Sequence, residues 1–233
     1  MIFRQLFDSS SSTYTYLIAS GKGREAIIID PVLEHTALYI KLIQELNLQL
    51  VISLDTHTHA DHITASGSLS KQTNCARALG ENTKAECVTM RVKEGEKINV
   101  DGVTLETLYT PGHTDDSYSF FMGDRVFTGD TLLVRGTGRT DFQCGDSHQQ
   151  YDSIFNKLLK LAPNTLVYPA HDYKGMTVST IEEEKLFNPR LQVNSSDEYA
   201  AIMDNLNLAN PKLMDIAVPA NMKCGMFAGE TAG

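Results

Sequence analysis

Tryptophan is absent from this 233-residue chain, and cysteine is scarce. The four cysteines, Cys75, Cys87, Cys144 and Cys224, are scattered and form no CxxC pair. In a reducing compartment this pattern gives no disulfide framework, so we expect four free thiols. Cys224, near the end of the sequence, is the thiol to examine for oxidation.

Positive charge is also in short supply, because 20 Lys and Arg face 29 Asp and Glu, which gives a net charge of −9. A surface this acidic repels phosphate backbones, so nucleic acid is not an expected partner. No apolar run approaches the roughly 18 residues of a membrane span. The N-terminal segment lacks the basic, apolar and small-residue regions of a signal peptide. We therefore expect a cytoplasmic protein with no membrane partner.

What the sequence does contain is a globular composition, with 42% hydrophobic and 21% charged residues. That is enough for one domain with a sizeable core, and it argues against disorder. Hydrophobic periodicity predicts helices at 35–46, 63–72, 147–161, 180–186 and 196–206. Strands are predicted at 2–7, 13–18, 26–29, 50–55, 97–100, 103–109, 117–122, 125–127 and 165–168. This uneven alternation favours an α+β architecture in which helices cover sheets.

Three of the seven histidines fall in one short run, THTHADH, directly after the apolar strand LVISLD. His57 and His59 are two residues apart, so in extended backbone they face the same side. Asp61 and His62 follow where the chain turns into a helix. A polar surface loop is the alternative, but the concentration of histidines here favours a loop that aims several ligands at one point.

Three later residues also follow predicted strands. His113 lies in TPGHT, Asp130 in FTGDT and His171 in YPAHD. Small or turn residues precede each of them, which lets the backbone approach a shared centre. Each residue alone would be an ordinary loop residue, but ligand types at four separate strand ends together indicate a metal site.

The succession HxHxDH, PGHT, GD and H resembles the metallo-β-lactamase superfamily over about residues 10 to 175. The resemblance implies an αβ/βα sandwich with metal at one edge. It places the metallo-β-lactamase-fold domain at residues 1–175. Residues 176–233 would then form a short C-terminal helical extension and tail, packed on the same domain.

Residue types separate the branches of this superfamily. Antibiotic-hydrolysing members carry cysteine where Asp130 stands, and diiron oxygen-reducing members carry glutamate where His59 stands. Nucleic-acid-processing members have a large inserted domain. Two branches remain, glyoxalase II, a binuclear thioesterase, and persulfide dioxygenase, and both share all seven potential ligands.

Segments outside the ligands resemble the persulfide dioxygenases. They are 138–143 (GRTDFQ), 171–173 (HDY), 177–184 (TVSTIEEE), 188–191 (NPRL), 205–208 (NLNL) and 218–225 (VPANMKCG). Glyoxalase II instead ends in a larger helical domain. One departure is Asp115-Asp116, where that family has proline and glycine, and it affects the pocket wall rather than the ligands.

The resemblance implies one Fe(II) per chain, held by His57, His113 and Asp130. The other four ligand-type residues would surround these groups and orient them: His59, Asp61, His62 and His171. The implied reaction oxidises glutathione persulfide with O₂ to sulfite and glutathione, as a step of hydrogen sulfide metabolism.

Because glutathione carries two carboxylates, Arg139, Tyr173 and Arg190 are the predicted substrate-binding residues. The alternative for Arg139 is that it pairs with Asp141 or a backbone carbonyl and only shapes its loop. Two other functions stay open: a thioester hydrolase of glyoxalase II type acting on S-lactoylglutathione, and a non-catalytic metal or persulfide sensor. The sequence is also compatible with a homodimer.

Overall fold

The computed structural model describes residues 1–209 and 213–226 and contains two mixed six-stranded sheets. The chain divides into two compact units. Among the described residues, unit 1 comprises Met1–Val92, Ile98–Thr104 and residues 213–226, and unit 2 comprises Lys93–Lys97 and Leu105–Ala209.

The first sheet has the strand order β1-β2-β3-β4-β5-β6. Its first three strands pair antiparallel, and β3 to β6 pair parallel. The strands are β1 (Ile2–Asp8), β2 (Thr13–Ala19), β3 (Glu25–Ile29), β4 (Gln49–Leu54), β5 (Ala76–Gly80) and β6 (Met90–Val92).

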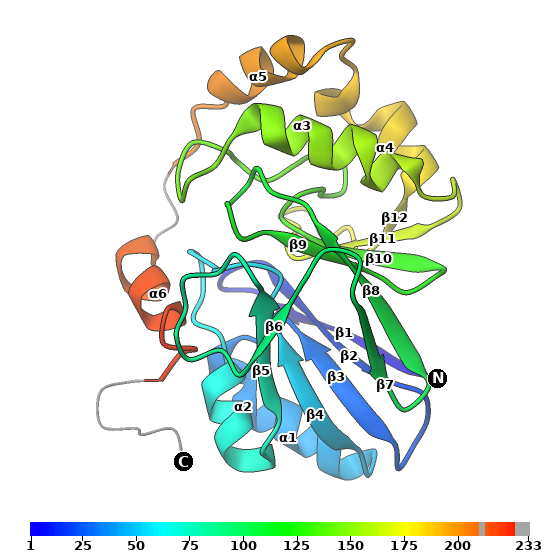
Figure 1. Cartoon of the computed structure of the whole chain (residues 1–233), viewed down its shortest axis with the longest axis vertical. Helices are drawn as coiled ribbons and strands as arrows, with labels where there is room; N and C mark the ends of the chain where they lie inside the picture. The colour runs from blue at the N-terminus through cyan, green and yellow to red at the C-terminus, as the bar shows by residue number, and fades with distance from the viewer. Residues whose placement is uncertain (210–212, 227–233) are drawn as a thin grey trace. The chain divides into compact units, whose positions relative to one another are not determined.

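Helices α1 (Thr36–Glu45) and α2 (Ser66–Thr73) supply the crossovers from β3 to β4 and from β4 to β5, with a 3₁₀ turn at Leu33–His35 before α1. Figure 1 shows both helices beside this sheet. They bury apolar side chains against it, including Leu17, Ile28, Tyr39, Leu50 and Leu69. This core packs beneath β3 and β4, and the histidine loop departs from the end of β4.

The second sheet has the order β12-β11-β10-β9-β8-β7. Its strands are β7 (Lys97–Val100), β8 (Val103–Tyr109), β9 (Tyr118–Phe121), β10 (Arg125–Gly129), β11 (Leu166–Pro169) and β12 (Ser179–Thr180). Strands β8, β9 and β10 pair antiparallel, whereas β10 and β11 pair parallel. The C-terminal ends of β10 and β11 therefore lie side by side.

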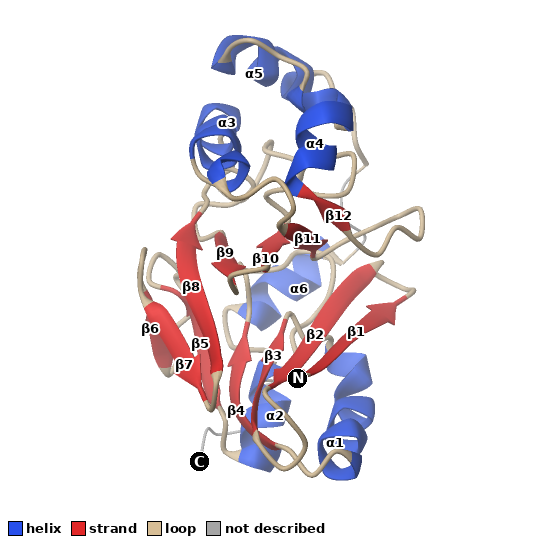
Figure 2. Cartoon of the chain, turned by 90° about the vertical axis from the view of Figure 1, so that its right-hand side faces the viewer, coloured by secondary structure: helices blue, strands red, loops and turns tan. Residues whose placement is uncertain are grey.

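Helix α3 (Ser147–Asn156) and the 3₁₀ turn Leu158–Lys160 connect β10 to β11. Helix α4 (Ile181–Phe187), the 3₁₀ turn Pro189–Leu191 and helix α5 (Ser196–Asp204) follow β12. Figure 2 shows α3 and α4 beside β9 to β12. Their shared core includes Val126, Ile154, Val167, Ile181 and Tyr199. Side chains of Asp146, Thr180 and Ser195 cap the three helices.

A disulfide joins Cys87 to Cys224, which corrects the expectation of four free thiols. The partners are 137 residues apart, and only the fold brings them together. Cys75, which is buried, and Cys144, which is exposed, are not part of a disulfide. The same C-terminal region contains helix α6 (Met214–Asn221), where the sequence had predicted only a tail.

The residues after 175 are shared between the units, since α4 and α5 belong to unit 2 and α6 to unit 1. The domain boundary at residue 175 stays a prediction. Among residues 1–209 and 213–226, no helix has both the length and the apolar character needed to cross a membrane.

Candidate metal centre

The histidine loop of unit 1 leaves β4 and packs its rings against one another. The ring centroids of His57 and His59 are 4.1 Å apart, and those of His59 and His62 are 4.3 Å apart. All three side chains are buried. At the base of the loop, the carboxylate of Asp55 accepts from the hydroxyls of Thr64 and Ser66, which ties the two ends of the loop together.

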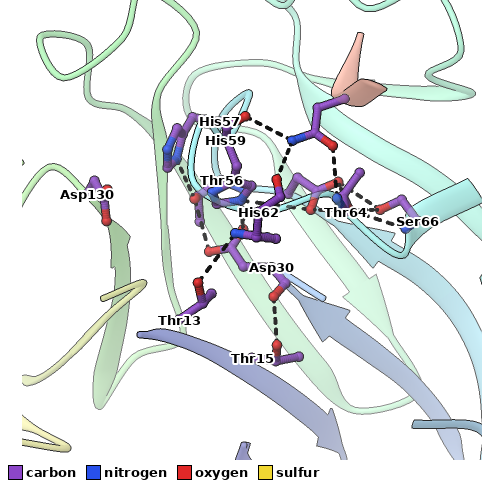
Figure 3. A network of polar contacts seen from close by, with 12 residues as sticks. Thr13, Thr15, Asp30, Thr56, His57, His59, His62, Thr64, Ser66 and Asp130 are labelled. Carbon is purple, nitrogen blue, oxygen red and sulfur yellow. Dashed lines mark hydrogen bonds and ion pairs between the residues drawn. The ribbon is translucent and has the colours of Figure 1, made fainter. Parts of the chain in front are cut away.

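A carboxylate that the sequence analysis did not assign, Asp30, organises this loop (Figure 3). It follows β3, is 1% exposed and has a φ of 49°. Its Oδ1 accepts from the Thr56 backbone N–H at 2.7 Å and faces His59 Nε2 at 3.0 Å. Its Oδ2 accepts from the Thr56 hydroxyl at 3.0 Å. In the sequence, Asp30 stands before Pro31 after an apolar strand, a pattern that is typical of a turn rather than of a functional residue.

The pKa of His59 lies well above its ordinary value. Burial lowers its pKa, but the charges of Asp30, Asp61 and Asp55 outweigh burial and raise the pKa to about 9. Burial, with the charge of Asp30 beside it, raises the pKa of Asp55 to about 6. The Nδ1 atom of His59 is buried without a hydrogen-bond partner among the described residues. A metal ion is a partner that would satisfy the lone pair of such a nitrogen.

Asp61 and His62 complete the group of ligand-type side chains in this loop, which we call the unit 1 cluster: His57, His59, Asp61 and His62. Asp61 Oδ2 lies 2.9 Å from His62 Nδ1 and accepts from the Thr13 hydroxyl at 3.1 Å. One ligand atom from each of His59, Asp61 and His62 lies within 4.8 Å of the others. The fold thus brings together the four predicted ligand residues of the HxHxDH motif.

Asn221, at the end of α6, fastens the loop from the C-terminal side. Its Nδ2 donates to the carbonyls of His59 at 2.9 Å and His62 at 2.8 Å. Its Oδ1 accepts from the backbone N–H of Thr64 at 2.9 Å. We had assigned no role to this asparagine, because contacts across about 160 residues leave no trace in one sequence.

The unit 2 cluster consists of the other three predicted ligands, and each follows a strand. His113 comes after β8, Asp130 directly after β10 and His171 after β11. His171 Nδ1 lies 2.6 Å from Asp130 Oδ1, and His113 Nε2 lies 3.5 Å from Asp130 Oδ2. These distances place one carboxylate between two imidazoles.

The tautomer of His113 follows from the hydrogen bond that its Nδ1 atom makes. Its Nδ1 lies 2.7 Å from the carbonyl oxygen of Arg139, which can only accept a hydrogen bond, so Nδ1 is the protonated nitrogen. In the neutral ring, the lone pair of Nε2 then faces the carboxylate of Asp130. Two facing lone-pair atoms repel each other unless a cation lies between them, so this pair suits a metal ion.

Two glycines allow these loops to approach so closely. A Cβ on Gly138 would stand 2.3 Å from the carbonyl oxygen of Asp130 and 2.8 Å from His113 Nδ1. A Cβ on Gly112, whose φ is 134°, would stand 2.3 Å from the backbone of Gln150. The small residues beside the predicted ligands are therefore needed for space.

The predicted substrate-binding residues all have contacts within the protein. Arg139 pairs with both carboxylate oxygens of Asp141 at 2.6 Å and donates to the Ala209 carbonyl at 2.7 Å. This is the geometry of the alternative in which Arg139 shapes its loop. Arg190 donates to the Thr137 carbonyl at 2.5 Å.

Tyr173, by contrast, is 72% exposed, and its ring stacks on that of His171 with 6.1 Å between centroids. The substrate-binding roles of Arg139, Arg190 and Tyr173 stay predictions.

Comparison with known proteins identifies the family of the chain. Residues 10–171 match the model of the metallo-beta-lactamase superfamily. The mitochondrial persulfide dioxygenase ETHE1 of Mus musculus is 47% identical over 229 residues, which cover 97% of this chain and 89% of that protein. The corresponding protein of Homo sapiens is 45% identical with the same coverage. The crystal structure of ETHE1 from Myxococcus xanthus has a TM-score of 0.94 and 54% identity, and the match covers 97% of this chain and 100% of that one.

A hydroxyacylglutathione hydrolase of Francisella tularensis subsp. novicida is more distant. It is 33% identical over 201 residues, which cover 80% of this chain and 75% of that protein. The chain belongs to the metallo-beta-lactamase superfamily and, within it, to the family of the persulfide dioxygenases.

Proposed function

We propose that this chain is an iron-dependent persulfide dioxygenase that oxidises glutathione persulfide with O₂ to sulfite and glutathione. The observation that carries the proposal is the 45 to 47% identity to persulfide dioxygenases over 97% of the chain. The hydroxyacylglutathione hydrolases match a smaller part of the chain, and their sequence identity is lower.

The proposed iron ligands are His57 from the unit 1 cluster and His113 and Asp130 from the unit 2 cluster. Two imidazoles and one carboxylate leave open positions, a donor set that suits ferrous iron in oxygenases. One feature supports a cation beside these ligands, the lone pair of His113 Nε2 that faces Asp130. Bound iron supplies the redox chemistry with dioxygen that zinc lacks.

The protein groups around the ligands fix their orientation. The carbonyl of Arg139 holds the proton of His113 on Nδ1, which keeps Nε2 available for the metal. His171 occupies Oδ1 of Asp130, which leaves Oδ2 as the ligand oxygen. His59, Asp61 and His62 form the remaining polar surround in this proposal.

The substrate requirements follow from glutathione persulfide itself. Its terminal sulfur gains the two atoms of O₂ and one oxygen from water, so the persulfide, O₂ and water yield glutathione, sulfite and two protons. Its two carboxylates need donors, for which we propose Arg139, Arg190 and Tyr173. Arg139 would exchange its contact with Asp141 for the substrate, and Tyr173 is 72% exposed.

Oxygen uptake separates this function from its main alternative. A glyoxalase II-type thioesterase is the second candidate, because the unit 1 cluster offers a further group of ligand atoms in His59, Asp61 and His62. Protein purified without oxygen and loaded with Fe(II) is given glutathione persulfide in an oxygen electrode, and sulfite is measured in parallel. We expect one O₂ consumed per sulfite formed. Hydrolysis of S-lactoylglutathione without oxygen uptake would contradict the proposal, and absence of any turnover would favour a sensor.

A further inference from the structure

Asp30 and Thr56 form a short chain of hydrogen bonds that ends on His57 (Figure 3). The Thr56 hydroxyl lies 3.0 Å from Asp30 Oδ2 and 3.0 Å from His57 Nδ1. Asp30 and Thr56 are each 1% exposed, so no bulk water competes for these groups. The positive φ of Asp30 is uncommon for a residue with a Cβ, and it aims the carboxylate at the loop.

The direction of each hydrogen bond can be deduced. A carboxylate accepts, so the single proton of the Thr56 hydroxyl points to Asp30 Oδ2. The hydroxyl oxygen can then only accept from its other neighbour, His57 Nδ1. Nδ1 of His57 therefore carries the ring proton, and Nε2 presents its lone pair.

We propose that Thr56 and Asp30 are positioning residues that set the tautomer of His57, so that Nε2 is the nitrogen offered to the metal. The inference rests on the proposed function only in taking His57 as a ligand. The same carboxylate receives Nε2 of His59 at 3.0 Å, so one buried acid fixes the orientation of two neighbouring imidazoles.

A purely structural role for the Thr56 hydroxyl makes a different prediction. As a buried polar group that only stabilises the loop, its loss would lower thermal stability and leave the tautomer of His57 unchanged. Thr15 offers a matched comparison, because its buried hydroxyl also bonds Asp30, but at the backbone carbonyl, 2.7 Å away. Thr15→Val removes a hydroxyl beside Asp30 without touching the carboxylate.

The first test reads the tautomer directly. Metal-free protein labelled with ¹⁵N-histidine is examined by long-range ¹H–¹⁵N correlation spectra, and the His57→Gln variant identifies the His57 signals. We expect Nδ1–H in the wild type, in Thr56→Ser and in Thr15→Val. In Thr56→Val we expect a substantial share of Nε2–H, because Nδ1 loses the Thr56 hydroxyl oxygen that accepts its proton. An unchanged His57 tautomer in Thr56→Val would overturn the inference.

Asp30→Asn gives a sharper outcome. The amide oxygen of the new side chain must face the Thr56 backbone N–H, which is a fixed donor. Its NH₂ group then faces the Thr56 hydroxyl, which becomes the acceptor and turns its own proton toward His57. The relay reverses, and we expect Nε2–H at His57. A His57 ring that keeps its proton on Nδ1 in this variant would contradict the mechanism.

The second test measures metal affinity with Co²⁺ as the probe against a competing chelator. Loss of an outer partner of a ligating histidine typically weakens binding roughly 10- to 100-fold. We expect that range for Thr56→Val and for Asp30→Asn, and a change within about threefold for Thr56→Ser and Thr15→Val. Equal affinities in Thr56→Val and Thr15→Val would refute the inference.

Thermal unfolding of the metal-free variants verifies that all of them are folded. Neither test uses persulfide or oxygen, so failure of the dioxygenase proposal would leave both results interpretable.

Discussion

The fastening of the histidine loop by Asn221 leads to a quantitative prediction. Asn221 is 5% exposed and makes three hydrogen bonds, two to the carbonyls of His59 and His62 and one from the N–H of Thr64. A typical hydrogen bond contributes about 1 kcal/mol net, and buried groups left without partners cost more. Asn221→Ala should therefore lower the free energy of unfolding by roughly 3 kcal/mol.

Urea unfolding of the metal-free protein measures this loss, and hydrogen exchange locates it. Because the Thr64 N–H loses its acceptor, its exchange should accelerate in Asn221→Ala. Asn156→Ala is the matched control, since Asn156 is exposed and donates only to Asp152 on its own helix, and it should stay within about 0.5 kcal/mol of the wild type. A loss below 1 kcal/mol in Asn221→Ala, with unchanged Thr64 exchange, would refute the view that this side chain holds the loop.

Three other predictions concern the disulfide, a buried tyrosine and a crowded glycine. Reduction of Cys87–Cys224 removes a cross-link between residues 137 positions apart, and chain entropy puts the loss in the free energy of unfolding at up to about 5 kcal/mol. Urea unfolding with and without reductant measures this loss, and an unchanged midpoint would contradict the prediction. Burial raises the pKa of Tyr39 to about 12, so its contribution to stability is complete below pH 10 and is lost as pH rises from 10 to 12. Tyr39→Phe should flatten that alkaline decline, and the same slope in both proteins would count against the assignment. Gly138→Ala should weaken Co²⁺ binding more than tenfold, because the added Cβ would stand 2.3 Å from the carbonyl oxygen of Asp130. The control is Gly136→Ala, whose Cβ would meet one atom at 3.9 Å, and it should leave Co²⁺ binding unchanged.

Much of the fold was predictable from local pattern. The strands at Lys97–Val100 and Val103–Tyr109 were predicted with their observed bounds, because alternating apolar and polar residues and an Asp-Gly turn mark a hairpin. The helix predicted at 35–46 is α1, Thr36–Glu45.

The missed elements lacked such marks. Strand β5 reads ARALG, without a β-branched residue, and forms because parallel neighbours bury it. Helix α6 contains Pro219, which argued against a helix at that position.

The residues of the site also differ in how far the sequence predicts them. Ligand-type residues could be predicted, because HxHxDH and the small-residue turns before His113 and Asp130 are local signals. The residues that orient the ligands could not, since Asp30 and Asn221 reach the loop from other parts of the chain. The Cys87–Cys224 disulfide is of the same kind, because nothing local to either cysteine indicates its partner.

The central claim is that one iron per chain supports oxygen-dependent turnover. Metal-free protein is titrated anaerobically with Fe(II), and the initial rate of oxygen uptake with glutathione persulfide is measured at each ratio. The account predicts a linear rise that ends at one equivalent of Fe(II) per chain and no uptake with Zn(II) alone. A break at two equivalents, or equal turnover with Zn(II), would contradict it.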